Sequence, residues 1–182
     1  MNIIETPIKD LLILEPKIWK DDRGYFFESY NQNTYKALDI DANFVQDNQS
    51  LSQTGTLRGL HAQDKPFAQG KLVRVIQGKV LDIAVDIRKN SPTFGENFSL
   101  ELSAENFKML WIPPGFLHGF VTLEDQTIFS YKVSGFYDKA SEIGVKWDDK
   151  DLNIDWKILH ETAILSEKDK VLGSFTDLKS SF

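Results

Sequence analysis

The clearest pattern of hydrophobic and polar positions lies between residues 71 and 87. Apolar residues at 81, 83, 85 and 87 alternate with their neighbours, and this period of two predicts a strand with one buried face. A β-branched run at 72–76 precedes it, and Gln77-Gly78-Lys79 separates the two runs. Two such runs around a short glycine-containing turn predict a β-hairpin.

Shorter apolar runs recur along the chain, with glycine and proline between them: 11–14, 26–30, 98–102, 109–112, 120–123 and 128–133. Helical signals are few. Residues 33–38 predict one short helix, and Ser166-x-x-Asp169 has the form of a capping box that could open another near the C-terminus. Many short strands and little helix predict an all-β barrel or jelly roll, with residues 1–182 forming one domain.

Composition narrows the function classes. The chain has 182 residues and no cysteine, which excludes disulfide frameworks, zinc ribbons and cysteine nucleophiles. Its net charge of −6 argues against nucleic acid as a partner. No apolar run approaches the ~20 residues of a membrane span, and residues 1–7 do not resemble a signal peptide. We therefore expect a cytoplasmic protein without a membrane partner.

Three histidines limit any imidazole chemistry to His61, His118 and His160. His118 ends the run Pro113-Pro114-Gly115-Phe116-Leu117-His118, which is similar to the second cupin motif, P-x-G-x-x-H. Metal-binding cupins also carry an H-x-H pair, whereas Gln63 stands two residues after His61. We therefore expect a cupin-type barrel without a metal site, and a surface position for His160.

Several other polar residues lie in apolar contexts, and composition alone leaves their roles open. Tyr131 could be an ordinary barrel aromatic, and Arg23 with Glu28 could be a solvated surface pair of little energetic value. The polar run Gln46-Asp47-Asn48 follows Phe44-Val45, and Gly70-Lys71 does not fit a P-loop.

The order of these segments resembles that of the dTDP-4-dehydrorhamnose 3,5-epimerase family from about residue 3 to residue 170. Each motif is weak alone, but together they form a specific series: Asp22-Arg23-Gly24, Phe44–Asn48, Leu57–His61, Gln69–Val73, Asp82–Asp86, Ser91–Gly95, Ile112-Pro113, Gly115–Phe120, Tyr131-Lys132 and Ser166–Asp169.

The resemblance implies a metal-free, cupin-like jelly roll that forms a homodimer with exchanged N-terminal strands and needs no cofactor. It implies that His61 is the general base, Tyr131 the general acid, and Asp169 the partner of His61. Lys71 would lie near the C4 oxygen of the sugar. The dTDP-sugar would be bound by Gln46, Asp47, Asn48, Arg58, His118, Glu142 and Lys168, with Tyr137 close by and with Arg23 and Glu28 contributed by the partner subunit.

These residue types suit the chemistry of a 4-keto sugar. The protons at C3 and C5 are both α to the carbonyl, so removing either gives an enolate, and inversion returns a proton on the opposite face. Neutral histidine has an ordinary pKa of ~6.5 and serves as a base near neutral pH, whereas tyrosine, at ~10, is protonated and can donate. A lysine cation would stabilise the enolate oxygen.

Three questions stay open at the level of sequence. Ala62 stands where the family usually has a tyrosine after the motif histidine, which leaves room for a 3- or 5-monoepimerase of a related deoxysugar pathway. Asp169 could orient His61 or cap a helix. A metal-dependent cupin oxygenase and a non-catalytic sugar-nucleotide-binding barrel are the alternatives from other classes.

Overall fold

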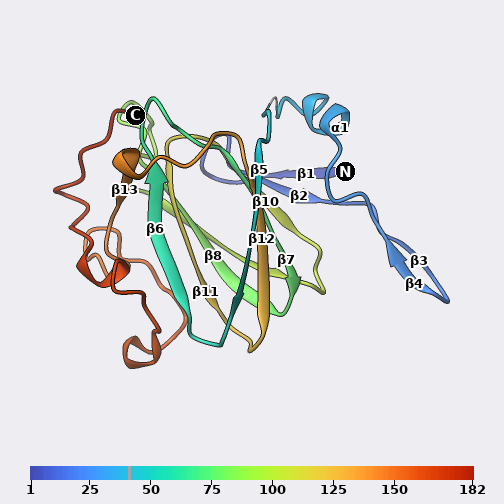
Figure 1. Cartoon of the computed structure of the whole chain (residues 1–182). Coiled ribbons are helices and arrows are strands. Elements are labelled where there is room, and N and C mark those ends of the chain that lie inside the picture. The colour runs from blue at the N-terminus through green and yellow to red at the C-terminus, as the bar shows by residue number, and fades with distance from the viewer. Residues whose placement is uncertain (41) are drawn as a thin grey trace.

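The protein folds as two β-sheets that face each other (Figure 1). The computed structural model describes residues 1–40 and 42–182. The six-stranded sheet has the order β1-β2-β10-β7-β12-β5, formed by Asn2–Glu5, Leu12–Glu15, Met109–Ile112, Lys71–Gln77, Thr127–Val133 and Gln46–Ser52. The five-stranded sheet has the order β13-β6-β11-β8-β9, formed by Glu142–Gly144, Leu57–Gln63, Phe116–Thr122, Lys79–Asp86 and Asn97–Ser103. The predicted all-β jelly roll is confirmed.

The predicted hairpin is present as β7 and β8, but β8 buries both of its faces rather than one. Leu81, Ile83 and Val85 pack in an outer core, while Val80 and Ala84 pack in the core between the sheets. The prediction of one buried face was wrong because the C-terminal part of the chain covers the outside of the five-stranded sheet.

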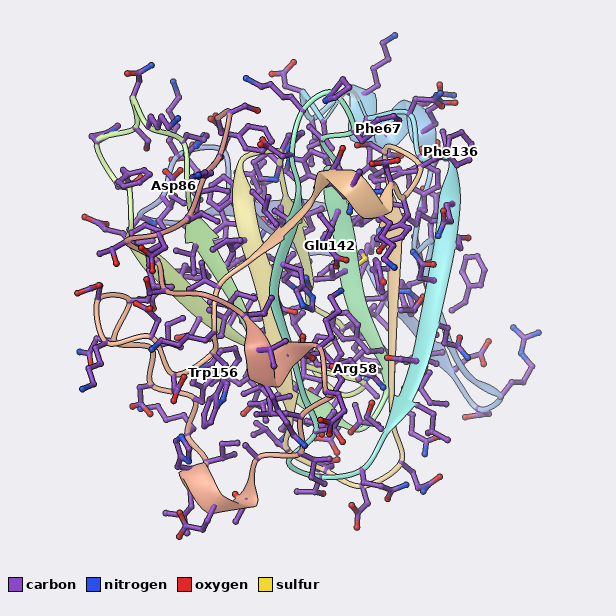
Figure 2. The ribbon with its side chains drawn as sticks, turned by 60° about the vertical axis from the view of Figure 1, so that its left-hand side comes forward. Arg58, Phe67, Asp86, Phe136, Glu142 and Trp156 are labelled. Atoms are coloured by element: carbon purple, nitrogen blue, oxygen red, sulfur yellow. The ribbon has the colours of Figure 1, made fainter. Side chains whose placement is uncertain are left out.

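The outer core extends into that C-terminal part. Val145, Trp147, Leu152 and Trp156 are buried there against side chains of β6, β8 and β11. Figure 2 shows the C-terminal chain crossing in front of the five-stranded sheet, with Trp156 among the covering side chains. A sheet covered on both faces provides a rigid wall for the cavity described below.

Helix is scarce, as expected. The α-helix α1 spans Gln32–Lys36 and is capped by Asn31, whose side-chain oxygen accepts from the amides of Asn33 and Thr34. Ser166-x-x-Asp169 opens a single 3-10 turn, Asp169–Val171, rather than a longer helix. Two further 3-10 turns span Lys139–Ser141 and His160–Thr162.

A small hairpin projects from the body of the molecule (Figure 1). It consists of β3 (Trp19–Asp21) and β4 (Gly24–Phe26), which pair only with each other. Trp19 is 49% exposed, Tyr25 57% and Phe26 68%. Such a cluster of exposed aromatic side chains marks an interaction surface. Among the described residues, no helix is long and apolar enough to cross a membrane.

Candidate active site

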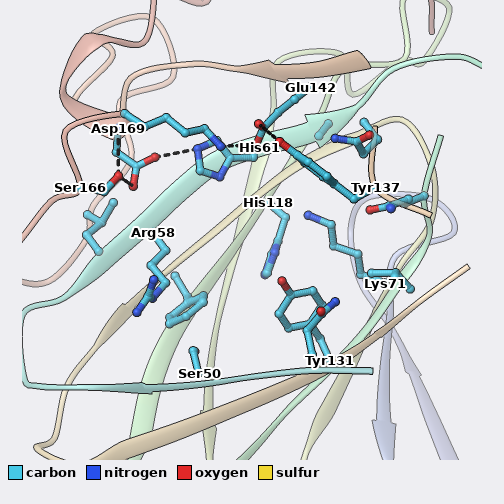
Figure 3. Close-up of a pocket in the computed structure, with 18 of the residues that line it drawn as sticks. Ser50, Arg58, His61, Lys71, His118, Tyr131, Tyr137, Glu142, Ser166 and Asp169 are labelled. Carbon is cyan, nitrogen blue, oxygen red and sulfur yellow. Dashed lines mark hydrogen bonds and ion pairs between the residues drawn. The ribbon is translucent and has the colours of Figure 1, made fainter. Parts of the chain in front are cut away.

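A cavity of about 800 Å³ lies between the two sheets and is closed on one side by the C-terminal chain. Figure 3 shows side chains converging on it from both walls. Its lining includes most of the residues predicted to form the site: Gln46, Asn48, Arg58, His61, Lys71, His118, Tyr131, Tyr137, Glu142, Lys168 and Asp169. The fold therefore brings together residues that span more than half of the sequence.

Strand β5 supplies polar side chains to the cavity at every second position. Gln46, Asn48 and Ser50 line it, because successive side chains of a strand point to opposite faces. Asp47 consequently faces away, and its carboxylate accepts from Lys132 Nζ at 2.8 Å. The expectation that Asp47 lies in the binding site is corrected by this alternation.

Strand β6 places Arg58 and His61 on the same wall, although they are three positions apart along the strand. Regular alternation would put them on opposite faces. The pairing register between β6 and β11 breaks at this point, between His118 and Phe120, and an irregularity of this kind re-aims a side chain. Gly59 has a φ of +123°, and a Cβ there would lie 2.5 Å from Gly119 Cα. Glycine is required because the two strands approach so closely.

His61 pairs with Asp169. The distance from His61 Nε2 to Asp169 Oδ1 is 2.7 Å, and the carboxylate is 5% exposed (Figure 3). Burial works to raise the pKa of Asp169, but His61, Ser166 and Lys168 outweigh it and the net direction is downward. An ionised Asp169 beside Nε2 favours the tautomer of His61 with the proton on that nitrogen, and this tautomer leaves the lone pair of Nδ1 available as a base.

The alternative role of Asp169, as the cap of a helix, does not compete with its contact to His61, because Ser166 forms the capping hydrogen bond. The Ser166 hydroxyl accepts from the Asp169 amide at 3.2 Å and so caps the turn itself. It also donates to Asp169 Oδ2 at 2.8 Å. The other carboxylate oxygen stays free to meet His61, so capping and orientation coexist.

Lys71 and His118 both line the cavity. Burial lowers the pKa of Lys71 to about 8, although the charges of Asp82 and Glu142 oppose the change. His118 Nε2 lies 2.9 Å from a carboxylate oxygen of the fully buried Asp82. Burial also lowers the pKa of His118, again against Asp82. His118 is the register partner of His61 on the neighbouring strand, so both imidazoles belong to one wall.

Tyr131 stands on the opposite wall. It belongs to β12 of the six-stranded sheet, beside Asn48 of β5, whereas His61 belongs to the five-stranded sheet. Burial raises the pKa of Tyr131 above its ordinary value, and Arg58 only partly offsets this. The phenol is therefore protonated at neutral pH and can donate.

The cavity mouth carries a charged cluster. Tyr137 donates to Glu142 at 2.9 Å, and Lys168 forms an ion pair with the same carboxylate. Burial works to raise the pKa of Glu142, but Lys168 and Tyr137 lower it on balance. The Tyr137 ring remains 55% exposed at this edge, so a flat ligand group could stack on it.

Besides Asp47, two predicted site residues are absent from the lining of this cavity, Arg23 and Glu28. Arg23 is at the tip of the projecting hairpin and donates to Asp21 at 2.5 Å. Glu28 accepts from Asn31 and Thr34. Neither lines the cavity of its own chain. His160 lies on the surface against Trp147, with a ring separation of 4.6 Å.

Ala62 follows His61, and its side chain lies on the other face of β6. It is 6% exposed and packs in the outer core with Leu60 and Ile83, and the residue is also part of the cavity lining. The exchange of the usual tyrosine for alanine therefore concerns the wall of the cavity as well as the outer core.

Sequence reasoning missed some members of the site. Ser50 lines the cavity, and its buried hydroxyl has no hydrogen-bond partner among the described residues. The alternation Gln46, Asn48, Ser50 was the signal that could have found it. Asp82 looked like one polar position within a hydrophobic strand, and only the structure shows that it pairs with His118.

Comparison with known proteins gives a consistent result. The family model for dTDP-4-dehydrorhamnose 3,5-epimerase matches residues 5–177. The dTDP-4-dehydrorhamnose 3,5-epimerase of Shigella flexneri is 53% identical over 178 residues, which cover 97% of each chain.

Solved structures agree with the sequence relatives. The crystal structure of dTDP-4-dehydrorhamnose 3,5-epimerase from Elizabethkingia anophelis superposes with a TM-score of 0.94 at 50% identity and covers 97% of both chains. A dTDP-6-deoxy-D-glucose-3,5-epimerase from Legionella pneumophila, in complex with dTDP-4-keto-L-rhamnose, has a TM-score of 0.93 at 47% identity and covers 98% of this chain and 94% of its own.

Proposed function

This chain belongs to the dTDP-4-dehydrorhamnose 3,5-epimerase family, and on that premise we propose how its cavity performs the epimerisation. The protein is an isomerase of the epimerase class. It converts dTDP-4-dehydro-6-deoxy-D-glucose to dTDP-4-dehydro-L-rhamnose by inverting C3 and C5. In our proposal residues 1–182 act as one domain, without a cofactor or a metal.

The observation that supports the mechanism best is the opposition of an oriented imidazole and a protonated phenol across one cavity. The His61–Asp169 pair comes from one wall and Tyr131 from the other. Inversion needs a base on one face of the sugar ring and an acid on the other. A single cavity of about 800 Å³ provides room for the sugar between them.

The proton transfers balance without any other reactant. His61 Nδ1 takes the proton from C5 or C3, and the C–H electron pair moves through the C4 carbonyl to leave an enolate. Lys71 stabilises the negative oxygen as an ammonium group. Tyr131 then donates its proton to the same carbon from the opposite face, and exchange with solvent restores both residues.

The nucleotide part would be bound by polar residues around this centre. We assign Arg58 and Lys168 to the diphosphate because they supply cationic donors at the cavity edge. Gln46, Asn48, His118 and Glu142 complete the polar lining, with Tyr137 beside the substrate at the mouth.

We also propose a homodimer in which N-terminal strands are exchanged. The exposed aromatic hairpin of β3 and β4 supports this, since a second copy would cover it. The partner's copies of the Arg23 and Glu28 side chains would then complete each site. The proposed location is the cytoplasm, and cell fractionation tests it.

Epimerisation at both carbons is favoured over a single one by the relatives. The 3,5-epimerase of Shigella flexneri is 53% identical to this chain, whereas a 3'-monoepimerase from Streptomyces bikiniensis is 30% identical. A 3- or 5-monoepimerase remains the alternative that the experiment below is designed to separate.

Turnover in deuterium oxide tests the reaction. The purified protein is incubated with dTDP-4-dehydro-6-deoxy-D-glucose, and NMR locates the deuterium. We expect label at C3 and at C5 of the product. Label at one carbon would instead establish a monoepimerase, and unlabelled substrate would contradict epimerase activity altogether.

His61→Ala provides the matched control. No other base is positioned on that wall in our mechanism, so turnover should fall by about 10³-fold or more. Circular dichroism and the melting temperature should remain near those of the unsubstituted protein, because the imidazole is partly exposed.

A further inference from the structure

A short chain of contacts leads away from the His61–Asp169 pair. Asp169 Oδ1 meets His61 at 2.7 Å, and Oδ2 accepts from the Ser166 hydroxyl at 2.8 Å. Ser166 and Asp169 both line the cavity (Figure 3). We infer that Ser166 is a positioning residue for catalysis, because it fixes the carboxylate that orients the general base.

The carboxylate needs a second partner in order to present one fixed oxygen. A buried carboxylate with a single bonded oxygen can rotate about its Cβ–Cγ bond, whose torsion is broad. The Ser166 hydroxyl bonds one oxygen, and its own position is fixed because it accepts from the Asp169 amide at 3.2 Å. This closed turn therefore defines which oxygen faces His61.

The turn is held against the barrel by the segment that carries it. We call residues 164–173 the C-terminal strap. Its first residue is anchored by the bond from the Ile164 amide to Gly55 at 2.8 Å. Its last is anchored by the bond from the Lys146 amide to Gly173 at 2.9 Å. Because both ends are fixed, the orientation of Asp169 depends on the local turn rather than on movement of the whole strap.

The chain contains a second turn of the same form that serves as a control. Ser174 donates to Asp177 Oδ2 at 2.5 Å and accepts from the Asp177 amide at 3.3 Å. Neither residue lines the cavity. The two turns share their chemistry, and only the first contacts the base.

The inference rests on the proposed role of His61 as base, and two measurements test it. The first is the kinetics of Ser166→Ala, Ser166→Thr and Ser174→Ala with dTDP-4-dehydro-6-deoxy-D-glucose. We expect Ser166→Ala to lower kcat about tenfold, the effect of one hydrogen bond on a barrier. KM should stay within about twofold of the unsubstituted value, because the Ser166 hydroxyl is already bonded to the Asp169 carboxylate and amide. Ser166→Thr should restore kcat, and Ser174→Ala should leave it unchanged.

The second measurement is the proton NMR signal of the His61 Nε2–H, assigned by its loss in His61→Ala. Its chemical shift should move in Ser166→Ala and stay in place in Ser166→Thr and Ser174→Ala. This readout requires no turnover, so it tests the arrangement even if the proposed reaction were wrong. An unmoved signal with an unchanged kcat would overturn the inference. So would equal losses of kcat and melting temperature in Ser166→Ala and Ser174→Ala, which would show a general structural role.

Discussion

Lys71 is a buried cation in the cavity. Burial of its charge lowers the free energy of unfolding, whereas the same charge can stabilise the enolate during catalysis. Its pKa falls from an ordinary 10.5 to about 8 because burial disfavours the ammonium form. Between these two values the unfolded chain binds more protons than the folded one, so stability rises with pH across that window. Below pH 8 the buried ammonium group lowers the free energy of unfolding by its full amount, about 3 kcal/mol for a pKa shift of this size.

Replacing Lys71 by methionine should separate the two effects. Lys71→Met should increase the free energy of unfolding at pH 7, by as much as about 3 kcal/mol, with the gain disappearing near pH 11. Turnover should fall by about 10²-fold or more because the enolate oxygen loses its cation. Urea unfolding at both pH values and steady-state kinetics measure this, and a variant less stable than the parent at pH 7 would contradict it.

The same group predicts how activity depends on pH. Because the ammonium form stabilises the enolate, kcat should decline as pH rises through about 8. Asp82→Asn removes a charge that works to raise the pKa of Lys71, so the decline should begin at a lower pH. A pH–kcat profile of both proteins measures the shift, and coincident alkaline limbs would argue against it.

Substitution of Tyr131 tests to which face of the sugar ring the proton returns. Tyr131→Phe removes the acid and leaves His61 in place, so a proton abstracted from the sugar can return only to the same face. In deuterium oxide the recovered substrate should gain label while product formation falls by about 10²-fold or more. NMR of the substrate pool detects this, and the absence of label in it would show that Tyr131 is required for abstraction itself.

At the scale of elements, hydrophobic periodicity finds some of the strands that form the site and misses two of them, β5 and β6. The predicted hairpin of β7 and β8 and the runs at β9, β10 and β12 are confirmed. Strands β5 and β6 were found only as motifs. Along β5 the inward positions are Gln46, Asn48 and Ser50, while Leu51 faces outward and is 56% exposed. A ligand-binding interior inverts the usual pattern of apolar inside and polar outside.

The candidate site, like the strands, was predicted in part from the sequence. The order of motifs was sufficient to select His61, Lys71, Tyr131 and Asp169, and all four line one cavity. The outward direction of Asp47 and the pairing of Asp82 with His118 depend on register and burial. Those are properties of the packed barrel that no single stretch of sequence contains.

The register shift between β6 and β11 depends on the close approach of the two strands at Gly59. Gly59→Ala introduces a Cβ 2.5 Å from Gly119 Cα at a φ of +123°, so β6 and β11 must separate. We expect a loss of about 2–4 kcal/mol in the free energy of unfolding. The relative positions of Arg58 and His61 should change as well, and kcat should fall more than for Gly173→Ala, where a Cβ meets nothing within 4 Å. Denaturation curves and kinetics of the two variants make the comparison, and equal behaviour would contradict it.

At the scale of the whole molecule, the projecting hairpin predicts shared active sites. Arg23→Ala and His61→Ala should each give an inactive homodimer if Arg23 serves the partner subunit. A mixed dimer would contain one site with both defects and one site with none. After equal amounts are unfolded together and refolded, about a quarter of the parent activity should return. Recovery of none would indicate that each chain uses its own Arg23.

The C-terminal strap also has a consequence for the order in which the enzyme is made. Synthesis proceeds from the N-terminus, and domains begin to fold as they emerge. All the strands of both sheets precede the strap in the sequence, so the barrel can close before Asp169 leaves the ribosome. Until the strap docks, His61 lacks its partner, so the base is completed by a segment that is synthesised after every strand of the barrel.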